Sequence, residues 1–375
     1  MGNSVLDGGA SAVNSDATIT KFYTSAAWTE GRAEEQLEQV AGWVGVQQIA
    51  AFPDLHPGKY GPVGCVVLAD RIFPQLIGND IGCGMALFQL DLPVRKLKLE
   101  KALRRMHVLG RPSDNHFADR LENSGLPADL FAASLGTIGG GNHFCEVQTL
   151  VDCDTELGLD QTLTYLLVHS GSRRLGNAVF GELPESAFSG MLPDDASTYL
   201  AGHEKAVLWA RLNRQIIAER AAEALRTDLH LIVDAPHNLL AQVDGGWLHR
   251  KGAAKADTPL VPLAGSRATP SFLMRPSGKD STLVSTAHGA GRRYDRASMH
   301  GRVRAKRSDV EAMQRTPFGG RIVCEDRDLL IEEAPLAYKS AQAVVADLEA
   351  TGAATPTAKF HPLLTFKKTR TEGRS

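Results

Sequence analysis

The 375-residue chain has few of the features that mark secreted or membrane proteins. It has only five cysteines, an odd number without a Cys-x-x-Cys pair, so a disulfide framework is not expected and a reducing compartment fits. No apolar run approaches the ~18 residues of a membrane span, and the N-terminal MGNSVLDGGA lacks the basic and apolar regions of a signal peptide. These absences predict a soluble, cytoplasmic protein with no membrane partner.

The chain also lacks an excess of positive charge. Its net charge is −2 and its pI is about 6.6, so bulk charge does not favour binding to nucleic acid. Such binding would depend on local clusters of basic residues, although runs of this kind are often only a solvated surface. Two clusters are present: Arg292, Arg293 and Arg296, and then Arg302, Arg304, Lys306 and Arg307.

The spacing of apolar residues predicts a mixed α/β fold. Helices are expected over residues 96–108, 199–226 and 334–350, the last with Pro335 near its start. Buried strands are expected over residues 63–69, 164–170, 229–235 and 282–288. Residues 1–20 are small and polar and predict a loose arm, and residues 21–375 are compatible with one large domain.

Seven short segments, six of them containing glycine and five containing histidine, lie at or near the ends of expected strands. Glycine is used where the backbone turns tightly or approaches a ligand. Any one of these segments could be an ordinary surface turn, but seven in one chain indicate a single large site built from many strand ends. They are residues 54–64, 78–84, 136–146, 169–176, 234–238, 263–271 and 287–292.

Five residues in these segments offer ligands for a metal ion. A thiolate, three imidazoles and a carboxylate form a competent mixed set for Mn²⁺, Zn²⁺ or Fe²⁺, and a carboxylate could bridge two ions, which suits phosphoryl transfer. A lone histidine at a strand end is more often structural, and no spacing in the sequence proves that the five converge. The candidates are Asp80, Cys83, His143, His169 and His237.

Two of the segments are suited to phosphate groups. Residues 136–143 and 288–293 place consecutive glycine N–H groups, which can form an anion nest, close to basic residues. Arg173 and Arg292 could clamp phosphate oxygens with both guanidinium arms. Neither segment is a Walker A loop or a dinucleotide fingerprint. His288 is the candidate nucleophile, because a neutral imidazole can attack phosphorus and carry the group as a phosphoramidate.

As a group, these segments resemble the RtcB family of RNA-splicing ligases in order and spacing. The similar motifs are NDIGCG (79–84), GTIGGGNHFCE (136–146), HSGSRRLG (169–176), HRKGAAKA (249–256), STAHGAGR (285–292) and EEAPLAYK (332–339). The resemblance covers residues 45 to 368. It implies a single α/β domain with a central β-sandwich-like core, surrounding helices and a wide basic cleft.

The resemblance also implies an activity. Members of the family use GTP and manganese to join an RNA 2′,3′-cyclic phosphate or 3′-phosphate end to a 5′-hydroxyl end, through a guanylate carried on histidine. His288 matches that histidine, and the five ligand candidates match the residues that hold two Mn²⁺ ions, with Cys83 able to bridge them. Arg173 and Arg292 would hold RNA phosphates.

The guanylate pocket carries over in the same way. Lys367, in LLTFKK, matches a terminal lysine that touches guanine. The residues that match the pocket are Asn142, His143, Phe144, Cys145, Glu146, His237, Asn238, Ala264, Gly265, Ser266, Arg267, Ser271, His288, Gly289, Ala290, Gly291 and Lys367.

Two departures from the family pattern keep alternatives open. Residues 264–267 read Ala-Gly-Ser-Arg where the family has Pro-Gly-Ser-Met, and RYDRASM follows GAGR. The shorter length resembles a branch that accompanies a peptide release factor homologue, which implies repair of ribosomal or transfer RNA with that homologue or the ribosome as partner. The alternatives are a manganese-dependent RNA cyclic phosphodiesterase without ligation, a non-catalytic factor that binds RNA ends, and an unrelated α/β enzyme.

Overall fold

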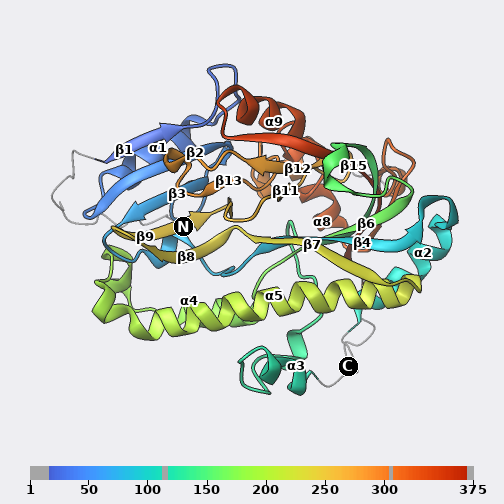
Figure 1. Ribbon diagram of the computed structural model, residues 1–375, viewed down its shortest axis with the longest axis horizontal. Coiled ribbons are helices and arrows are strands. Elements are labelled where there is room, and N and C mark those ends of the chain that lie inside the picture. The colour runs from blue at the N-terminus through green and yellow to red at the C-terminus, as the bar shows by residue number, and fades with distance from the viewer. Residues whose placement is uncertain (1–16, 112–116, 304–306, 370–375) are drawn as a thin grey trace.

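The computed structural model describes residues 17–111, 117–303 and 307–369, and its centre is an eight-stranded sheet (Figure 1). The sheet runs in the order β11-β12-β15-β5-β6-β4-β7, and β14 pairs with β15. Its strands are β4 (Gly84–Pro93), β5 (Phe144–Cys153), β6 (Leu163–Ser170), β7 (Leu229–Pro236), β11 (Val261–Leu263), β12 (Ser271–Pro276), β14 (Arg321–Cys324) and β15 (Ala354–Lys368). All neighbours are antiparallel except β14 and β15.

A five-stranded sheet of order β1-β2-β3-β9-β8 lies beside it, with a two-stranded ribbon of β10 and β13. These strands are β1 (Thr18–Lys21), β2 (Val46–His56), β3 (Val63–Ala69), β8 (Asn238–Val243), β9 (Gly246–Lys251), β10 (Ala253–Lys255) and β13 (Ser285–Ala287). The α-helices are α1 (Gly31–Ala41), α2 (Leu99–Met106), α3 (Ala118–Asn123), α4 (Arg173–Gly181), α5 (Ser197–Leu225), α6 (Arg296–Arg302), α7 (Arg307–Met313), α8 (Arg327–Glu332) and α9 (Ala341–Ala350).

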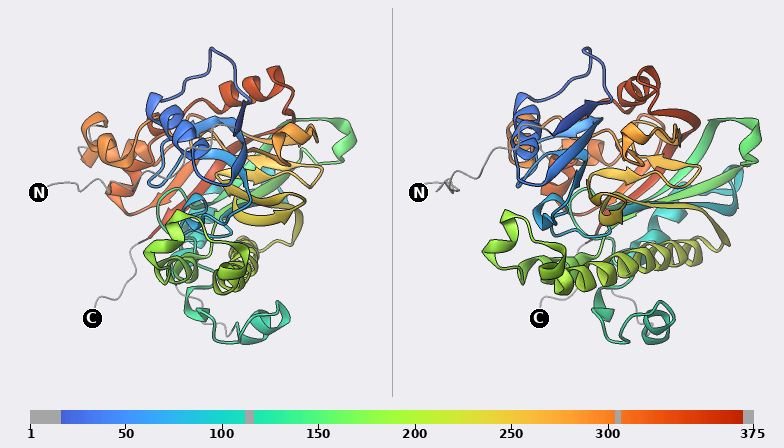
Figure 2. Two further views of the ribbon diagram at one scale, coloured as in Figure 1. Left: turned by 90° about the vertical axis from the view of Figure 1, so that its left-hand side faces the viewer. Right: turned by 60° about the vertical axis from the view of Figure 1, so that its left-hand side comes forward.

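Strand β6 shows why the central sheet is buried on both faces. Alternate side chains of a strand point to opposite faces. Leu166 and Val168 therefore pack with Ile217 of α5 in one hydrophobic cluster, whereas Tyr165 and Leu167 belong to another cluster enclosed by the curled sheet. Helix α5 runs along one side of the sheets, and α3 lies beyond it on the far side from the strands (Figure 2). The expected α/β class, with a central β core and surrounding helices, is confirmed.

Most of the expected helices are present. Residues 199–226 correspond to α5, and residues 96–108 contain α2 with short 3₁₀ turns on either side. The helix expected over 334–350 was wrong in its first part, because α9 begins only at Ala341, where Ser340 Oγ accepts a hydrogen bond from the N–H of Ala343. Tyr338 is extended, with φ −113° and ψ 154°, so its side chain contacts Glu333 instead of continuing a helical face.

The expected strands also agree, with one correction. Strands β3, β6 and β7 cover the three segments expected at 63–69, 164–170 and 229–235. The strand expected over 282–288 shrinks to β13, because Leu283 and Val284 adopt φ values of 50° and 49°. Left-handed backbone is strained for such residues, and the guanidinium of Arg250 holds it by donating hydrogen bonds to both carbonyls, at 3.4 and 3.3 Å.

Two other predictions fall partly on residues that the structure does not describe. Of the expected arm, residues 1–16 lie outside the described residues, and Thr18–Lys21 form β1, which pairs in parallel with β2. Of the second basic cluster, Arg304 and Lys306 also lie outside them. Among the described residues, no helix has both the length and the apolar character needed to cross a membrane.

Candidate functional site

The sheet register brings the predicted metal ligands to one edge of the central sheet. Met85 of β4 and Phe144 of β5 both pair with His169 of β6. Cys83, two residues before Met85, and His143, immediately before Phe144, therefore lie near His169. Gly84 pairs in turn with Pro236 of β7, so in this antiparallel pair Cys83 lies opposite His237, whose backbone N–H donates a hydrogen bond to the Cys83 carbonyl at 2.7 Å.

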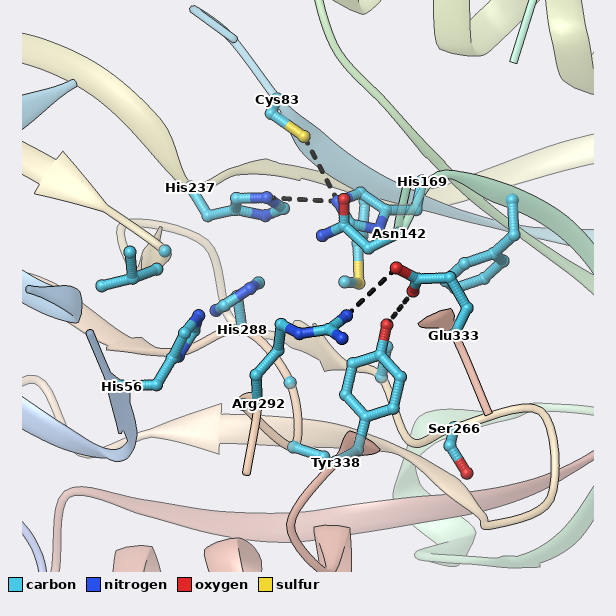
Figure 3. A pocket seen from close by; sticks show the side chains of 18 of the residues that line it. His56, Cys83, Asn142, His169, His237, Ser266, His288, Arg292, Glu333 and Tyr338 are labelled. Atoms are coloured by element: carbon cyan, nitrogen blue, oxygen red, sulfur yellow. Dashed lines mark hydrogen bonds and ion pairs between the residues drawn. The ribbon is translucent and has the colours of Figure 1, made fainter. Parts of the chain in front are cut away.

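The ligand atoms form two groups that share one sulfur, and Figure 3 shows the three residues of the first group, Cys83, His169 and His237. Cys83, His169 and His237 make one group, and Asp80, Cys83 and His143 make the other, with the ligand atoms of each within 4.8 Å of one another. Cys83 Sγ lies 3.2 Å from His169 Nε2 and 3.3 Å from His143 Nε2. Asp80 Oδ2 lies 2.8 Å from His143 Nε2, and His169 Nε2 lies 3.3 Å from His237 Nε2. All five predicted ligands therefore converge.

The chemistry of these donors fits a divalent metal ion. Burial lowers the pKa of His169 and of His237 well below the ordinary value, so both imidazoles are neutral and keep a lone pair for a cation. Burial also raises the pKa of the Cys83 thiol in the metal-free chain, and a coordinating ion reverses that effect by binding the thiolate. Glycine at position 171 permits the close approach of Asp80, since a Cβ there would lie 2.1 Å from its Oδ1.

Arg214 of α5 supports this edge from behind and was not anticipated from the sequence. Its Nη1 donates hydrogen bonds to the carbonyls of Gly82 at 2.8 Å and Ser170 at 3.0 Å, the residues next to Cys83 and His169. Its Nε and Nη2 donate to the two oxygens of Asp234, at 2.8 and 3.1 Å. One buried guanidinium therefore fixes both loops relative to each other.

His288 lies next to the metal-ligand groups, with its ring centroid 4.4 Å from that of His237. Asp54 of β2, which is fully buried, accepts hydrogen bonds from both the ring Nδ1 of His288, at 2.7 Å, and its backbone N–H, at 3.2 Å. Because a carboxylate is an acceptor only, it fixes the proton on Nδ1 and leaves the Nε2 lone pair free. This orientation is the one that a nucleophilic imidazole needs.

Lys339 holds the segment that carries Asp54. Its Nζ donates hydrogen bonds to the carbonyls of Pro53 at 2.9 Å and Leu55 at 2.6 Å, on either side of the aspartate. His56 follows on the same strand, and burial lowers its pKa to about 4, so it is neutral. The sequence signal for Asp54 was present, since it is an acidic residue in an otherwise apolar strand, but its partner was not visible.

One cavity of about 470 Å³ connects these groups. His288, Asp80, Cys83, His169 and His237 all line it, as do Arg292 and Lys367. The other predicted guanylate-pocket residues in its wall are Asn142, Phe144, Glu146, Asn238, Ala264, Gly265, Ser266, Arg267, Gly289, Ala290 and Gly291. A predicted metal cluster, a predicted nucleophile and a predicted nucleotide pocket therefore share one space.

Comparison with known proteins gives a consistent answer. A family model described as tRNA-splicing ligase RtcB matches residues 36–109, 115–191 and 182–368. The chain is 40% identical over 366 residues to the RNA-splicing ligase RtcB2 of Escherichia coli, covering 94% of this chain and 96% of the relative. The chain belongs to the RtcB family. It is thus an RNA-splicing ligase by family, and the resemblance carried by the motifs is confirmed.

More distant RtcB proteins match along nearly the whole chain as well. The RNA-splicing ligase RtcB of Escherichia coli K12 is 29% identical, covering 87% of this chain and 92% of the relative. The tRNA-splicing ligase RtcB of Archaeoglobus fulgidus is 28% identical, covering 89% and 90%. The match spans the metal-ligand groups, His288 and the strand that carries Lys367.

Four residues predicted for the RtcB-type site lie outside the cavity wall. His143 lies behind it, in contact with Cys83 and Asp80. The side chain of Cys145 points into the core with Leu166, because it alternates with its neighbours on β5, so its place in the pocket was wrong. Ser271 instead supports the pocket, since its Oγ accepts a hydrogen bond from the N–H of Gly265 at 3.1 Å.

Arg173 is the fourth predicted residue that lies outside the cavity wall. Its φ of 57° marks a strained backbone at the start of α4. The guanidinium packs so closely on Gly139 that a Cβ there would lie 2.0 Å from its Nη1. Burial lowers its pKa, while the nearby Asp80 and Cys83 oppose that shift. Arg173 therefore lies beside the metal-ligand groups and behind the surface of the cavity.

Glu333 is a third residue of this site, after Arg214 and Asp54, that sequence reasoning missed. Its carboxylate accepts hydrogen bonds from Arg292 at 3.0 Å, Arg296 at 3.2 Å and the hydroxyl of Tyr338, and Lys367 Nζ lies 3.8 Å away. Burial opposes ionisation, but the surrounding cations outweigh it and lower the pKa of Glu333 to about 2. Arg292 thus lines the cavity while paired with a carboxylate (Figure 3).

Proposed function

We propose that this chain is a GTP- and manganese-dependent ligase that joins an RNA 2′,3′-cyclic phosphate or 3′-phosphate end to a 5′-hydroxyl end through a guanylate on His288. One observation carries the proposal. His288 is oriented by a buried carboxylate, and its ring lies 4.4 Å, centroid to centroid, from that of the proposed metal ligand His237, with the two rings tilted at 44°, inside a cavity of nucleotide size. A structural histidine needs neither the buried aspartate nor the adjoining ligand groups.

The residues that would hold two manganese ions are those of the two groups that share Cys83. Bound there, the ions supply positive charge to neutralise the phosphoryl oxygens in the transition state. Arg214, by holding the Gly82 and Ser170 carbonyls, keeps the shared sulfur and His169 at a fixed separation.

The first chemical step belongs to His288. Its Nε2 lone pair attacks the α-phosphorus of GTP, the new N–P bond forms as the bond to the β-phosphate oxygen breaks, and pyrophosphate leaves. The attacking ring becomes positively charged. The Asp54 carboxylate, 2.7 Å from Nδ1, stabilises that charge and keeps the ring aligned.

Recognition of guanine is assigned to Glu146 and Lys367, which line the same cavity. Guanine presents two N–H donors on one edge and the O6 acceptor beside them, which suits a carboxylate and an ammonium group. Glu146 is held by hydrogen bonds from Gln148 and Thr365, so its position is fixed before the base arrives. These contacts favour a guanine over an adenine base.

The altered loop at 264–267 remains compatible with this pocket. Arg267 lines the cavity, and its guanidinium donates hydrogen bonds to the carbonyls of Glu333 at 2.9 Å and Leu330 at 3.0 Å. Ser266 donates its backbone N–H to Thr269 Oγ1 at 2.6 Å, which closes a tight turn. The loop is therefore anchored without the proline and methionine of the family motif.

The later steps transfer the guanylate from His288 to an RNA 3′-phosphate, which arises by hydrolysis of the cyclic phosphate. The 5′-hydroxyl of the second RNA end then attacks this activated phosphate, a phosphodiester forms and GMP leaves. Arg292 and Arg173 are the proposed phosphate contacts. Arg292 would have to exchange its present bond to Glu333 for a phosphate oxygen.

We also propose that the natural substrate is damaged ribosomal or transfer RNA in the cytoplasm, met together with a peptide release factor homologue or the ribosome. The length of the chain, which resembles the shorter branch of the family, supports this assignment. Re-joining of a cleaved ribosomal RNA by the protein with that partner is the expected result. Failure on cleaved ribosomes, beside good activity on nicked tRNA, would contradict it.

The deciding experiment for the reaction uses Mn²⁺ and α-labelled GTP with the native protein, His288→Ala and His230→Ala. His230 is an exposed histidine outside the cavity and serves as the control. Acid-labile label is expected on the native chain and the control and not on His288→Ala. Absence of label on all three, with manganese bound, would favour a cyclic phosphodiesterase, or a binding factor if RNA with a cyclic phosphate is also left intact.

A further inference from the structure

A second cavity of about 330 Å³ adjoins the first. The two share His56, Pro57, Gly58, Lys59, Arg292 and Asp295, so the second opens directly beside the segment that follows His288. Its remaining wall is formed by Glu30, Arg32, Arg293 and Tyr294. The proposed guanylate chemistry uses none of these four residues.

Aromatic rings and guanidinium groups alternate at this cavity. The Cζ atom of Arg293 lies 5.5 Å from the ring centroid of Trp28 and 5.4 Å from that of Tyr294. The Cζ atom of Arg302 lies 3.9 Å from the Tyr294 ring. Trp28 is 40% exposed, which is high for a tryptophan. Trp28 and Arg302 therefore lie beside the wall of this cavity, against Arg293 and Tyr294, and part of the Trp28 indole is open to solvent.

The charges of the stack are available to a ligand. Arg292 and Arg296 are neutralised by Glu333, whereas within the described part of the chain Arg293 and Arg302 form no ion pair with a carboxylate. The wall also contains the carboxylates of Glu30 and Asp295, and Asp295 is already used as the N-cap of α6, accepting from the Ser298 N–H at 3.0 Å. Flat rings beside unpaired guanidinium groups suit a ligand with bases and phosphates.

We propose that Trp28, Arg293 and Tyr294 form a stacking shelf for unpaired nucleotides of the RNA strand that flanks the end to be joined. A base stacks on the exposed indole or on the Arg293 plane, and Arg293 and Arg302 pair with the phosphates on either side. Stacking of this kind is tolerant of sequence, because every base has a flat face. The inference rests on the proposed function, since it takes the RNA end as the ligand.

Lys339 links the shelf to the reacting histidine. Its Nζ lies 5.5 Å from the centroid of the Trp28 ring and also donates to the carbonyls on either side of Asp54. A nucleotide seated on Trp28 therefore contacts the same structural unit that orients His288. This proximity places the flanking strand on a path that leads from the second cavity into the first.

The experiment measures binding of a short single-stranded RNA with a 3′-phosphate and a 5′ fluorophore, by anisotropy, to Trp28→Ala, Trp28→Phe and Arg293→Ala. We expect Trp28→Ala to weaken binding about tenfold and Trp28→Phe to restore most of it, because a ring remains. Arg293→Ala should reduce the slope of log affinity against log salt by about 0.7, the value of one phosphate contact on a single strand.

The matched controls are Phe131→Ala and Arg95→Ala. Phe131 is an exposed aromatic residue in the segment that follows α3, Arg95 is an exposed arginine, and both lie outside the two cavities. Binding by both should equal that of the native protein. The shelf would be overturned if folded Trp28→Ala bound the single strand as tightly as the Phe131→Ala control. It would also be overturned if Trp28→Ala lost as much affinity for a blunt RNA duplex as for the single strand.

Labelling of His288 with GTP, which needs no RNA, separates this inference from the proposed function. The shelf is supported if Trp28→Ala reduces the affinity for RNA by a clearly larger factor than it reduces the labelling of His288. If the native protein binds RNA through Trp28 and takes no label, the shelf stands and the ligase mechanism fails. If the native protein takes label and Trp28→Ala binds RNA as tightly as the native protein, the mechanism stands and the shelf fails.

Discussion

The Nδ1 atom of His288 lies 2.7 Å from Oδ2 of Asp54, although 234 residues separate the two in the chain. Asp54 is fully buried and accepts a second hydrogen bond from the backbone N–H of the same histidine. The carboxylate thus determines both the proton position and the ring orientation of His288.

Replacing Asp54 with Asn should lower the rate of guanylate transfer to His288. The amide carries no charge to stabilise the imidazolium that forms on attack, and it can rotate to present a donor to Nδ1, which selects the wrong tautomer. We expect a loss of 10- to 100-fold, about the size seen when orienting partners of functional histidines are removed. Single-turnover labelling with GTP measures the rate of this transfer.

The control is Asp91→Asn, which changes an exposed carboxylate paired with His230 and should label at the native rate. An equal labelling rate for Asp54→Asn and Asp91→Asn would contradict the role of Asp54.

Removing the Cys83 thiol should abolish metal binding in both ligand groups at once. Cys83 belongs to each group, so no complete set of three ligands remains in Cys83→Ala. Metal analysis after dialysis against Mn²⁺ should show near-complete loss of bound ion. Cys153→Ala removes a half-buried cysteine outside the site and should bind metal as the native chain does. Retention of metal by Cys83→Ala would show that the shared sulfur is not a ligand.

Arg214 and Arg211 of α5 both lie near Asp234 and offer a matched pair of substitutions. Arg214 is buried and bonds both carboxylate oxygens, whereas Arg211 is 69% exposed and 3.9 Å from Asp234. Arg214→Met should reduce the free energy of unfolding by about 3 to 5 kcal/mol, because it leaves a carboxylate and two loop carbonyls unpaired. Arg211→Met should change it by less than about 1 kcal/mol.

Urea unfolding with and without Mn²⁺ measures both variants. Arg214→Met should also gain less stability from the metal, since the loops that carry Cys83 and His169 are no longer held together. Similar unfolding free energies for the two variants would contradict this view of Arg214.

Glu146 should make stability depend on pH in an unusual direction. Burial raises its pKa from 4.5 to about 7 in the folded chain. Because the folded state holds the proton more tightly than the unfolded state, this contribution is fully present below pH 4.5 and is lost as pH rises through about 7. Glu146→Gln, which carries no titratable group, should remove that loss, to be measured by chemical denaturation at a series of pH values. An unchanged slope in the variant would assign the titration elsewhere.

The same titration should appear in the affinity for GTP. A protonated Glu146 presents only part of its acceptor capacity to the guanine N–H groups, so the apparent KM for GTP should fall as pH rises through about 7. Glu146→Gln should bind GTP weakly with little pH dependence. A KM that is flat with pH in the native chain would argue against contact between Glu146 and guanine.

The sequence predicted residues that the structure brings together. Cys83, His143, His169 and His288 stand in glycine-rich segments, His237 follows the end of an expected strand, and the strand register then places them together. Asp54 opens the segment 54–64 and Glu333 lies in the motif EEAPLAYK, but neither position by itself indicated a role, and Arg214 is one arginine in a long helix. Their roles depend on partners far away in the chain, which spacing and periodicity do not reveal.

Two local predictions failed for a related reason. Residues 334–340 have the composition of a helix, but Tyr338 is extended, its hydroxyl bonds to Glu333, and the side chain of Lys339 donates to the carbonyls on either side of Asp54. Residues 282–284 have the composition of a strand, but Arg250 holds their carbonyls in a left-handed turn. In both places long-range hydrogen bonds override the local preference.

The sharing of Cys83 by two ligand groups has a consequence for synthesis on the ribosome. The group of Asp80, Cys83 and His143 is complete in the nascent chain well before His237, the last member of the other group, has been made. His288 emerges later than every ligand. On the proposed two-ion mechanism, we therefore expect a first ion to be captured while the sheet is still growing, and the second ion and the proposed nucleophile to be added to a centre that is already partly built.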